Sequence, residues 1–321
     1  MTKENSGSSL STRERVGLVI DGTNAAAAVK TIATAEAAGV RQIWMTQPPS
    51  SPDTLTTLAA AAIKTSTIRL GTSIVPTYPR HPVVMAQQAM SLYDIAPGRL
   101  RLGIGPSHQS IIEGIYGLPQ TTPLAHLREY LNVLRTALCY GKVDHQGKFF
   151  NIKVTLPHTA QIPVLISTLG VKAFQLAGEL ADGALSWVCP VPYLIRTGIP
   201  ALRAAASANG RSAPPLVAYI SVALTQHRHS ILDAGHQMID MYAKFPFYAK
   251  MFADAGFPLI AGQMIPDSLI HGLIVSGNED TVAEQFTKLM AAGLDELMVT
   301  LIPIKDAEDG FTRLVNLIGH L

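Results

Sequence analysis

Side chains that could exchange protons or donate hydrogen bonds follow several short apolar runs in this sequence. The run over residues 99–105 ends in Gly105, Pro106, Ser107 and His108. An imidazole titrates near neutral pH and can pass a proton to or from a bound molecule. The hydroxyl of Ser107 can donate a hydrogen bond, and glycine allows the backbone to approach a ligand closely. A single histidine in a loop is more often a surface residue, so a ligand site and an exposed loop both remain open.

A second polar turn follows the apolar run over residues 163–167. Its residues are Ser167, Thr168, Leu169, Gly170, Val171 and Lys172. The pattern predicts a helix over residues 171–180, and the free N–H groups at a helix start attract phosphate. Two hydroxyls would strengthen that attraction, whereas the competing interpretation is a plain helix cap. The position of the turn after a strand favours phosphate binding.

A third strand end lies within residues 70–82, where Ser73 and Ile74 precede a proline-rich stretch that contains Tyr78. A bulge or a non-prolyl cis peptide bond at Ser73 and Ile74 would press the backbone toward a flat ligand. A cis bond of this kind costs ~3 kcal/mol and tends to occur at ligand clamps. Taken alone, these residues favour an ordinary buried strand. Thr46 ends the second strand and would face the same side of the sheet.

Alternating strands and helices must position these turns. Strands are expected over residues 16–20, 42–45, 67–75, 99–105, 163–167, 183–188, 216–225 and 296–300. Helical patterns lie between them, and residues 143–153 read as an inserted β-hairpin. This order predicts an α/β fold, a (β/α)8 TIM barrel with insertions, whose strand ends meet at one mouth. A doubly wound sheet is the competitor, but no GxGxxG follows the first strand.

One large domain accounts for most of the chain. We expect residues 1–15 to form a disordered tail and residues 16–321 a single barrel domain. Residues 229–274 exceed a normal strand-to-helix connection, which predicts an insertion over one end of the barrel. The aromatic side chains of this insertion favour a bulky, partly apolar substrate, or equally a packing or dimer contact. They are Tyr242, Phe245, Phe247, Tyr248 and Phe252, with Met251 between them.

Composition narrows the class of protein. The 321 residues are 48% hydrophobic and carry a net charge of +2, which argues against nucleic acid or an anionic membrane as a partner. The two cysteines, Cys139 and Cys189, cannot form a disulfide framework or a zinc cluster. No apolar run reaches the ~18 residues expected of a membrane span, so a cytoplasmic protein is expected. Without a metal signature, redox chemistry would require an organic cofactor.

In these stretches the chain resembles the luciferase-like monooxygenase superfamily, and within it the branch that uses the deazaflavin coenzyme F420. The resemblance extends from Val16 onward. It is carried by residues 70–82, 87–93 with 97–100, 102–108, 127–134, 178–183, and 276–277 with 281–284. These stretches are specific to the superfamily and less specific for F420 over FMN, because both cofactors occupy the same barrel mouth in the family.

The resemblance implies a bacterial luciferase-like barrel with a flavin-type ring at its C-terminal mouth. It implies a non-prolyl cis bond at or beside Ser73 and Ile74 that backs the ring. The turn over residues 167–172 would bind the phosphate-bearing tail of the cofactor, and residues 105–108 would line the ring or its side chain. We also expect Thr46, at the end of the second strand, to contact the cofactor.

One departure from the family bears on the reaction. Deazaflavin alcohol and sugar-phosphate dehydrogenases of this family carry an acidic residue followed by histidine at the end of the second strand, where this chain has Thr46 and Gln47. Loss of that base favours reduction of an enone, imine or iminium carbon over alcohol oxidation. His108 and Tyr78 are the candidate proton donors for such a reduction.

Three functions follow from the sequence. The leading hypothesis is an F420-dependent oxidoreductase that transfers a hydride to or from a small organic substrate. The alternatives are an FMN-dependent luciferase-like monooxygenase and a non-catalytic flavin-binding member of the family. A homodimer is also considered, because family members are often dimers.

Overall fold

A closed barrel of parallel strands forms the centre of the molecule. The computed structural model describes residues 10–20, 22–259 and 265–321. Within them, eight parallel strands close into the expected (β/α)8 barrel, since the last strand pairs with the first. Around the ring the strands are β1 (Val16–Ile20), β2 (Gln42–Met45), β3 (Arg69–Thr72), β5 (Leu100–Gly105), β8 (Val164–Thr168), β9 (Gly183–Ser186), β10 (Leu216–Ala223) and β12 (Glu296–Leu301).

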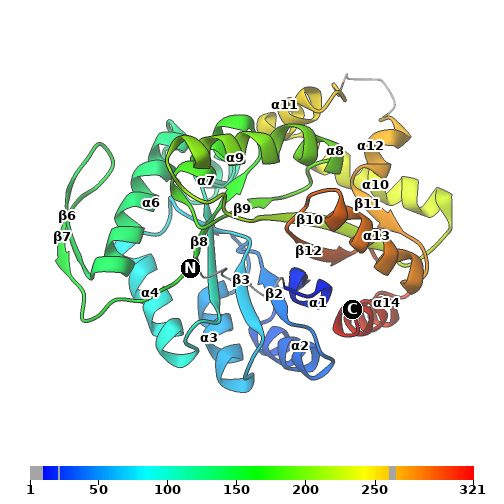
Figure 1. Cartoon of the computed structure of the whole chain (residues 1–321), viewed down its shortest axis with the longest axis horizontal. Helices are drawn as coiled ribbons and strands as arrows, with labels where there is room; N and C mark the ends of the chain where they lie inside the picture. Colours follow the sequence, from blue (N-terminus) through cyan, green and yellow to red (C-terminus); the bar gives the residue numbers. More distant parts are fainter. Residues whose placement is uncertain (1–9, 21, 260–264) are drawn as a thin grey trace, which may run out of the picture.

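Helices surround this ring, with α2 and α3 below the strands and α7 and α9 above them in the view of Figure 1. The larger helices of the barrel are α2 (Ala25–Ala37), α3 (Thr54–Lys64), α4 (Pro82–Ile95), α6 (Pro123–Tyr140), α7 (Val171–Leu180), α9 (Ile199–Ala208), α13 (Glu279–Ala291) and α14 (Ala307–Gly319). Several begin at a side-chain cap; Asp53, for example, accepts a hydrogen bond from the N–H of Thr56 at the start of α3. The shorter elements near the strand ends are β4 (Val75–Pro76), α5 (Gln109–Gly114), α8 (Val191–Tyr193) and the π-helical turn η1 (Leu194–Gly198).

The insertions lie where the sequence predicts them. The hairpin of β6 (Lys142–Gln146) and β7 (Asn151–Thr155) projects at the left of Figure 1 beyond α6. The long insertion forms α10 (Arg228–Ala243), α11 (Pro246–Asp254) and α12 (Asp267–His271), grouped at the upper right. It ends in a short strand, β11 (Ile274–Ser276), which pairs with the end of β10 and was not predicted.

The end of the predicted tail is ordered. Residues 1–9 lie outside the described part of the chain, but Thr12–Arg15 form the helix α1, so the tail expectation is wrong for these residues. Ser11 and Glu14 cap α1 reciprocally. The guanidinium of Arg15 donates to the backbone oxygens of Leu294 and Asp295, which fixes α1 against the start of β12.

The indole of Trp44 fills the barrel interior. Trp44 is fully buried on β2, and two neighbouring strands carry glycine where they face it. A Cβ atom on Gly71 would lie 2.3 Å from the indole, and one on Gly17 would lie 2.6 Å from it. Glycine at these two positions therefore leaves room for the largest side chain of the core.

A buried ion pair lies beside Trp44 in the barrel interior. Arg101 donates from both terminal nitrogens to the two carboxylate oxygens of Glu296, at 2.6 and 2.8 Å, and also to Gln42 at 3.0 Å. The arginine lies 5.0 Å from the centre of the Trp44 ring. This two-point pairing satisfies both charges where water is excluded.

Among the described residues, no helix is long and apolar enough to cross a membrane.

Candidate functional site

The end of β3 carries a distorted backbone at the barrel mouth. The peptide bond between Ser73 and Ile74 is cis, at the place that the resemblance to the family implied. Ser73 donates its N–H to the oxygen of Met45 at 2.8 Å, which joins this bend to the end of β2. Its hydroxyl is buried and has no hydrogen-bond partner among the described residues. This hydroxyl at the barrel mouth is therefore free to donate a hydrogen bond to a bound molecule.

Three predicted site residues converge at the barrel mouth: Ile74 directly precedes β4, Gly105 ends β5, and Ser167 lies near the end of β8. A Cβ atom on Gly105 would lie 2.2 Å from the hydroxyl oxygen of Ser167 and 3.2 Å from the Ile74 side chain. The lack of a side chain at Gly105 therefore allows Ser167 and Ile74 to pack closely against the end of β5. The predicted contacts at Ile74, Gly105 and Ser167 share one wall of the mouth.

The loop after β5 holds Ser107 and His108 in a fixed conformation. Ser107 has a φ of 60°, which is uncommon for a residue other than glycine and is often found at functional sites. Gln120 donates to the backbone oxygen of Pro106 at 2.7 Å. Glu113, five residues beyond His108, accepts hydrogen bonds from the side chain of Gln109 and the backbone N–H of Gln120, so this carboxylate is engaged away from the imidazole.

His108 lies under the long insertion. Its ring stacks on Phe245 at 3.8 Å with 15° between the planes, and Tyr248 lies 5.7 Å away. Burial lowers the pKa of His108, because the charged imidazolium loses its water. His108 is therefore mainly neutral at pH 7, and its protonated form is a stronger acid than a free imidazole.

Tyr78 lies in different surroundings from His108. Its hydroxyl donates to the backbone oxygen of Thr121 at 3.0 Å, and its ring stacks on His126 at 4.0 Å. Burial raises the pKa of Tyr78. The two predicted proton donors are thus held by separate contacts, and the Tyr78 proton is already engaged.

The turn between β8 and α7 leaves its backbone donors uncapped. Gly170 stands at the N-cap of α7 without a side-chain hydrogen bond, and a Cβ added to it would meet no atom within 4 Å. Thr168 is directed elsewhere, since its hydroxyl donates to the backbone oxygen of Leu185 at 3.2 Å. The oxygen of Leu169 accepts from Tyr193, and Val171 is exposed at the first turn. A free helix start beside open space is suited to an anion.

The end of β2 is closed by its own hydrogen bonds. The backbone oxygen of Thr46 accepts from the hydroxyl of Thr54 at 2.7 Å. Gln47 accepts from the N–H of Thr54 at 2.7 Å and donates to the oxygens of Pro48 and Pro52. Gln47 therefore stabilises the loop before α3 and offers no titratable group. Asp21, at the end of β1, lies outside the described residues.

An aromatic cluster that the sequence did not reveal connects the insertion to the barrel. Trp187, directly after β9, donates its indole N–H to the Tyr242 hydroxyl at 2.6 Å, and its ring lies tilted by 38° against Tyr219 of β10, with the ring centres 4.1 Å apart. Tyr242 lies 4.8 Å from Tyr248, which is nearly fully buried. Next to Trp187, Val188 has a φ of 50°, which is strained for a β-branched residue. The unusual backbone at Val188 and the tryptophan both follow a strand end, but no sequence signal pairs them with Tyr242.

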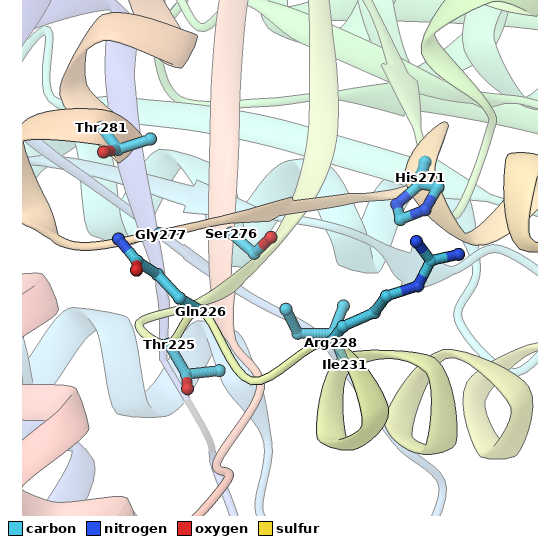
Figure 2. A pocket seen from close by; sticks show the side chains of 8 residues that line it. All are labelled: Thr225, Gln226, Arg228, Ile231, His271, Ser276, Gly277 and Thr281. Carbon is cyan, nitrogen blue, oxygen red and sulfur yellow. The ribbon is translucent and has the colours of Figure 1, made fainter.

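Two surface pockets open at the ends of β10, β11 and β12 and share Thr225. One of about 280 Å³ is drawn in Figure 2. The other pocket, of about 330 Å³, is lined by the apolar side chains of Leu224, Leu301 and Ile302 and by charged side chains.

Among the described residues, no group of three or more His, Cys, Asp or Glu side chains could hold a metal ion.

Comparison with known proteins identifies the family. The model of the luciferase-like monooxygenase family matches residues 5–296. The chain belongs to the luciferase-like monooxygenase family. Members of this family and its structural neighbours are oxidoreductases and monooxygenases, and this protein is an enzyme of that class.

Relatives of this luciferase-like protein use two kinds of flavin cofactor. A 5,10-methylenetetrahydromethanopterin reductase of Methanolobus tindarius is 25% identical over 286 residues, covering 82% of this chain and 86% of its own. The structure of an F420-dependent secondary alcohol dehydrogenase with an F420–acetone adduct has a TM-score of 0.78 at 16% identity, covering 95% and 97% of the two chains. The oxygenating component of a Pseudomonas putida type II Baeyer–Villiger monooxygenase, in complex with FMN, has a TM-score of 0.75 at 17% identity, covering 95% and 96%. These structural likenesses show the fold.

Proposed function

We propose that this luciferase-like protein is an F420-dependent reductase of an electrophilic organic substrate, such as an enone, imine or iminium compound. Similarity to a methylenetetrahydromethanopterin reductase along most of both chains supports this class. A bound deazaflavin would supply the hydride for the substrate carbon. The protein's own part is to bind and orient both molecules, to exclude water and to provide a proton.

The residues at the mouth fit a ring with a phosphate-bearing tail. Ser73 has a buried hydroxyl without a described partner, and the start of α7 has free N–H groups beside open space at Gly170. The backbone from Ser167 to Val171 would hold the phosphate, because a helix start favours negative charge. Ile74 and Gly105 would back the ring, with Thr46 and Ser107 at its edges.

The observation that best supports reduction over oxidation is the presence of Gln47, a residue that cannot act as a base, at the end of β2. Alcohol oxidation needs a base that takes the hydroxyl proton, and the related dehydrogenases have histidine at this position. Here the Gln47 amide is bound to Thr54, Pro48 and Pro52 of its own loop. Hydride transfer to an electrophile needs no base there, which favours reduction.

His108 is the better placed of the two proton donors. Tyr78 would have to break its hydrogen bond to Thr121 before it could donate to a substrate. His108 lies against Phe245 and Tyr248 of the insertion, and burial lowers its pKa. The protonated imidazole would therefore release its proton readily to a substrate atom that gains negative charge. The same aromatic side chains would shield the reaction from water.

The test is a comparison of both reaction directions. Reduced F420 is mixed with the protein and a panel of cyclic enones and imines, and loss of the reduced form is followed by the return of deazaflavin absorbance. In parallel, oxidised F420 is offered with secondary alcohols. The proposal requires turnover in the first assay and little in the second. Turnover of alcohols alone, or oxygen-dependent turnover with FMN alone, would overturn it; the second outcome would support the monooxygenase alternative.

A further inference from the structure

The pocket in Figure 2 lies outside the residues assigned to the cofactor. It is an open surface pocket bordered by the loop after β10, the start of α10, the end of α12 and the link from β11 to α13. The lining residues are Thr225, Gln226, Arg228, Ile231, His271, Ser276, Gly277 and Thr281. The volume of about 280 Å³ suits a small polar group rather than a flavin ring.

Hydrogen-bond donors dominate this lining, which contains no carboxylate. Figure 2 shows Arg228 and His271 pointing toward one another at one end of the pocket, with Ser276 in the middle and Thr281 at the far end. A guanidinium and an imidazole N–H that face each other can both donate hydrogen bonds to an anion placed between them. Asp267, outside the lining, accepts from Arg228 at 2.8 Å. It offsets part of the charge while leaving other guanidinium N–H groups to donate.

The walls of the pocket are fixed by hydrogen bonds. Gly277 donates its N–H to the oxygen of Ala223 at 3.2 Å, and Gln285 donates to the oxygen of Ser276 at 2.9 Å. Gly277 has a φ of 150°, and a Cβ there would lie 2.7 Å from Thr281. A wall held in place before a ligand arrives costs less entropy on binding.

The ring order places this pocket across the mouth from the distorted bend. Going round the barrel from β3, the strands are β5, β8, β9 and then β10, and the other way they are β2, β1, β12 and again β10. β10 therefore stands opposite β3, whose end leads into Ser73 and Ile74. The proposed phosphate site at α7 follows β8, two strands away from β10. A ligand group in this pocket would approach the mouth from the side facing the cofactor.

We propose that this pocket binds the anionic oxygen group, a phosphate or carboxylate, of the substrate. This inference rests on the proposed function, because the molecule that carries the anionic group is the one that exchanges a hydride with F420. Arg228 would be the principal contact, His271 a second donor, and the hydroxyl of Ser276 a third, whereas the Thr281 hydroxyl already donates to Asn278 at 2.6 Å. The substrate class is thereby narrowed to electrophiles that carry an acid group.

The test measures anion binding without any deazaflavin. Glycerol 3-phosphate, glycerate and uncharged glycerol are titrated into the full-length protein by calorimetry at fixed ionic strength. We expect at least one of the two anions to bind saturably and at least tenfold more tightly than glycerol. Arg228→Gln should weaken that binding at least tenfold, and His271→Gln at least threefold. Arg203→Gln, at an exposed arginine of α9, is the matched control and should change nothing.

Two results would overturn the proposal. The first is anion binding no tighter than that of glycerol, or anion binding that Arg228→Gln leaves intact. The second is a tenfold loss of F420 affinity in Arg228→Gln, which would assign the pocket to the tail of the cofactor instead of the substrate. Because the anion titration contains no deazaflavin, a failure of the proposed cofactor would leave its result standing, so the two failures can be told apart.

Discussion

The imidazole of His108 and the ring of Phe245 lie face to face, 3.8 Å apart and 15° from parallel. His108 follows β5 of the barrel, whereas Phe245 stands at the junction of α10 and α11 in the insertion. The contact therefore joins the barrel mouth to the segment that covers it. It also contributes to the burial that lowers the pKa of His108.

Removing the Phe245 ring should raise the pKa of His108 toward its ordinary value. The cause of the depressed pKa is loss of water around the charged form, and Phe245→Ala readmits water. The measurement is an NMR titration of the His108 ring protons between pH 4 and 8. Phe247→Ala is the matched control, because Phe247 belongs to the same segment but is 54% exposed. An unchanged His108 pKa in Phe245→Ala would show that the stack is not what excludes water.

Replacing His108 should lower turnover far more than cofactor affinity. A general acid contributes about 10²- to 10⁴-fold to a rate, so His108→Gln should lose turnover in that range while F420 affinity changes less than threefold. In the unaltered protein, turnover should fall as the pH rises above the lowered pKa of His108, because the protonated form is the donor. His108→Gln should remove this dependence, and His229→Gln, at an exposed histidine of α10, should retain it. Equal rates for His108→Gln and the unaltered protein would remove His108 from the mechanism.

A methyl group at position 105 should disturb the mouth. The Cβ of alanine would meet the Ser167 hydroxyl at 2.2 Å, so Gly105→Ala should cost about 1–3 kcal/mol of stability and weaken F420 binding. The double variant Gly105→Ala with Ser167→Ala removes that oxygen and should recover part of the stability. Gly114→Ala is the control, since a Cβ there meets no atom within 4 Å. Urea unfolding and F420 titration check both effects; a Gly105→Ala protein as stable as the control would contradict the close packing.

Acid should destabilise the fold through His126. Burial among aromatic rings lowers the pKa of His126 to about 4, so the unfolded chain takes up this proton at a higher pH than the folded protein does. The unfolding free energy should therefore decrease as the pH falls from about 6.5 to about 4, by roughly 3 kcal/mol from this group. His126→Phe should flatten the decrease, while His229→Asn should not. The comparison is made by urea unfolding at pH 7.5 and 4.5, and parallel losses in the unaltered protein and His126→Phe would refute the assignment.

Local sequence patterns predicted the strands and helices of the barrel. They could not predict contacts between residues that lie far apart in the sequence. The runs that became β1 and β2 and the helix α7 have strong apolar or helical patterns, so their places followed from the residues. β11 has three residues, too few to carry such a pattern. The cis bond at Ser73 followed from the family resemblance, since its residues by themselves favour an ordinary strand. The hydrogen bond from Trp187 to Tyr242 joins residues 55 positions apart, and only the folded chain brings them together.

The most direct test of the central claim is a fluorescence titration of the purified apo protein with coenzyme F420 and, separately, with FMN. We expect saturable, micromolar or tighter binding of F420 and much weaker binding of FMN. Gly170→Pro, which alters the free backbone at the start of α7, should weaken F420 binding at least tenfold, and Gly114→Ala, at an exposed glycine where a Cβ meets no atom within 4 Å, should not. Preference for FMN, or binding of neither cofactor, would contradict the assignment of this protein to deazaflavin-dependent reduction.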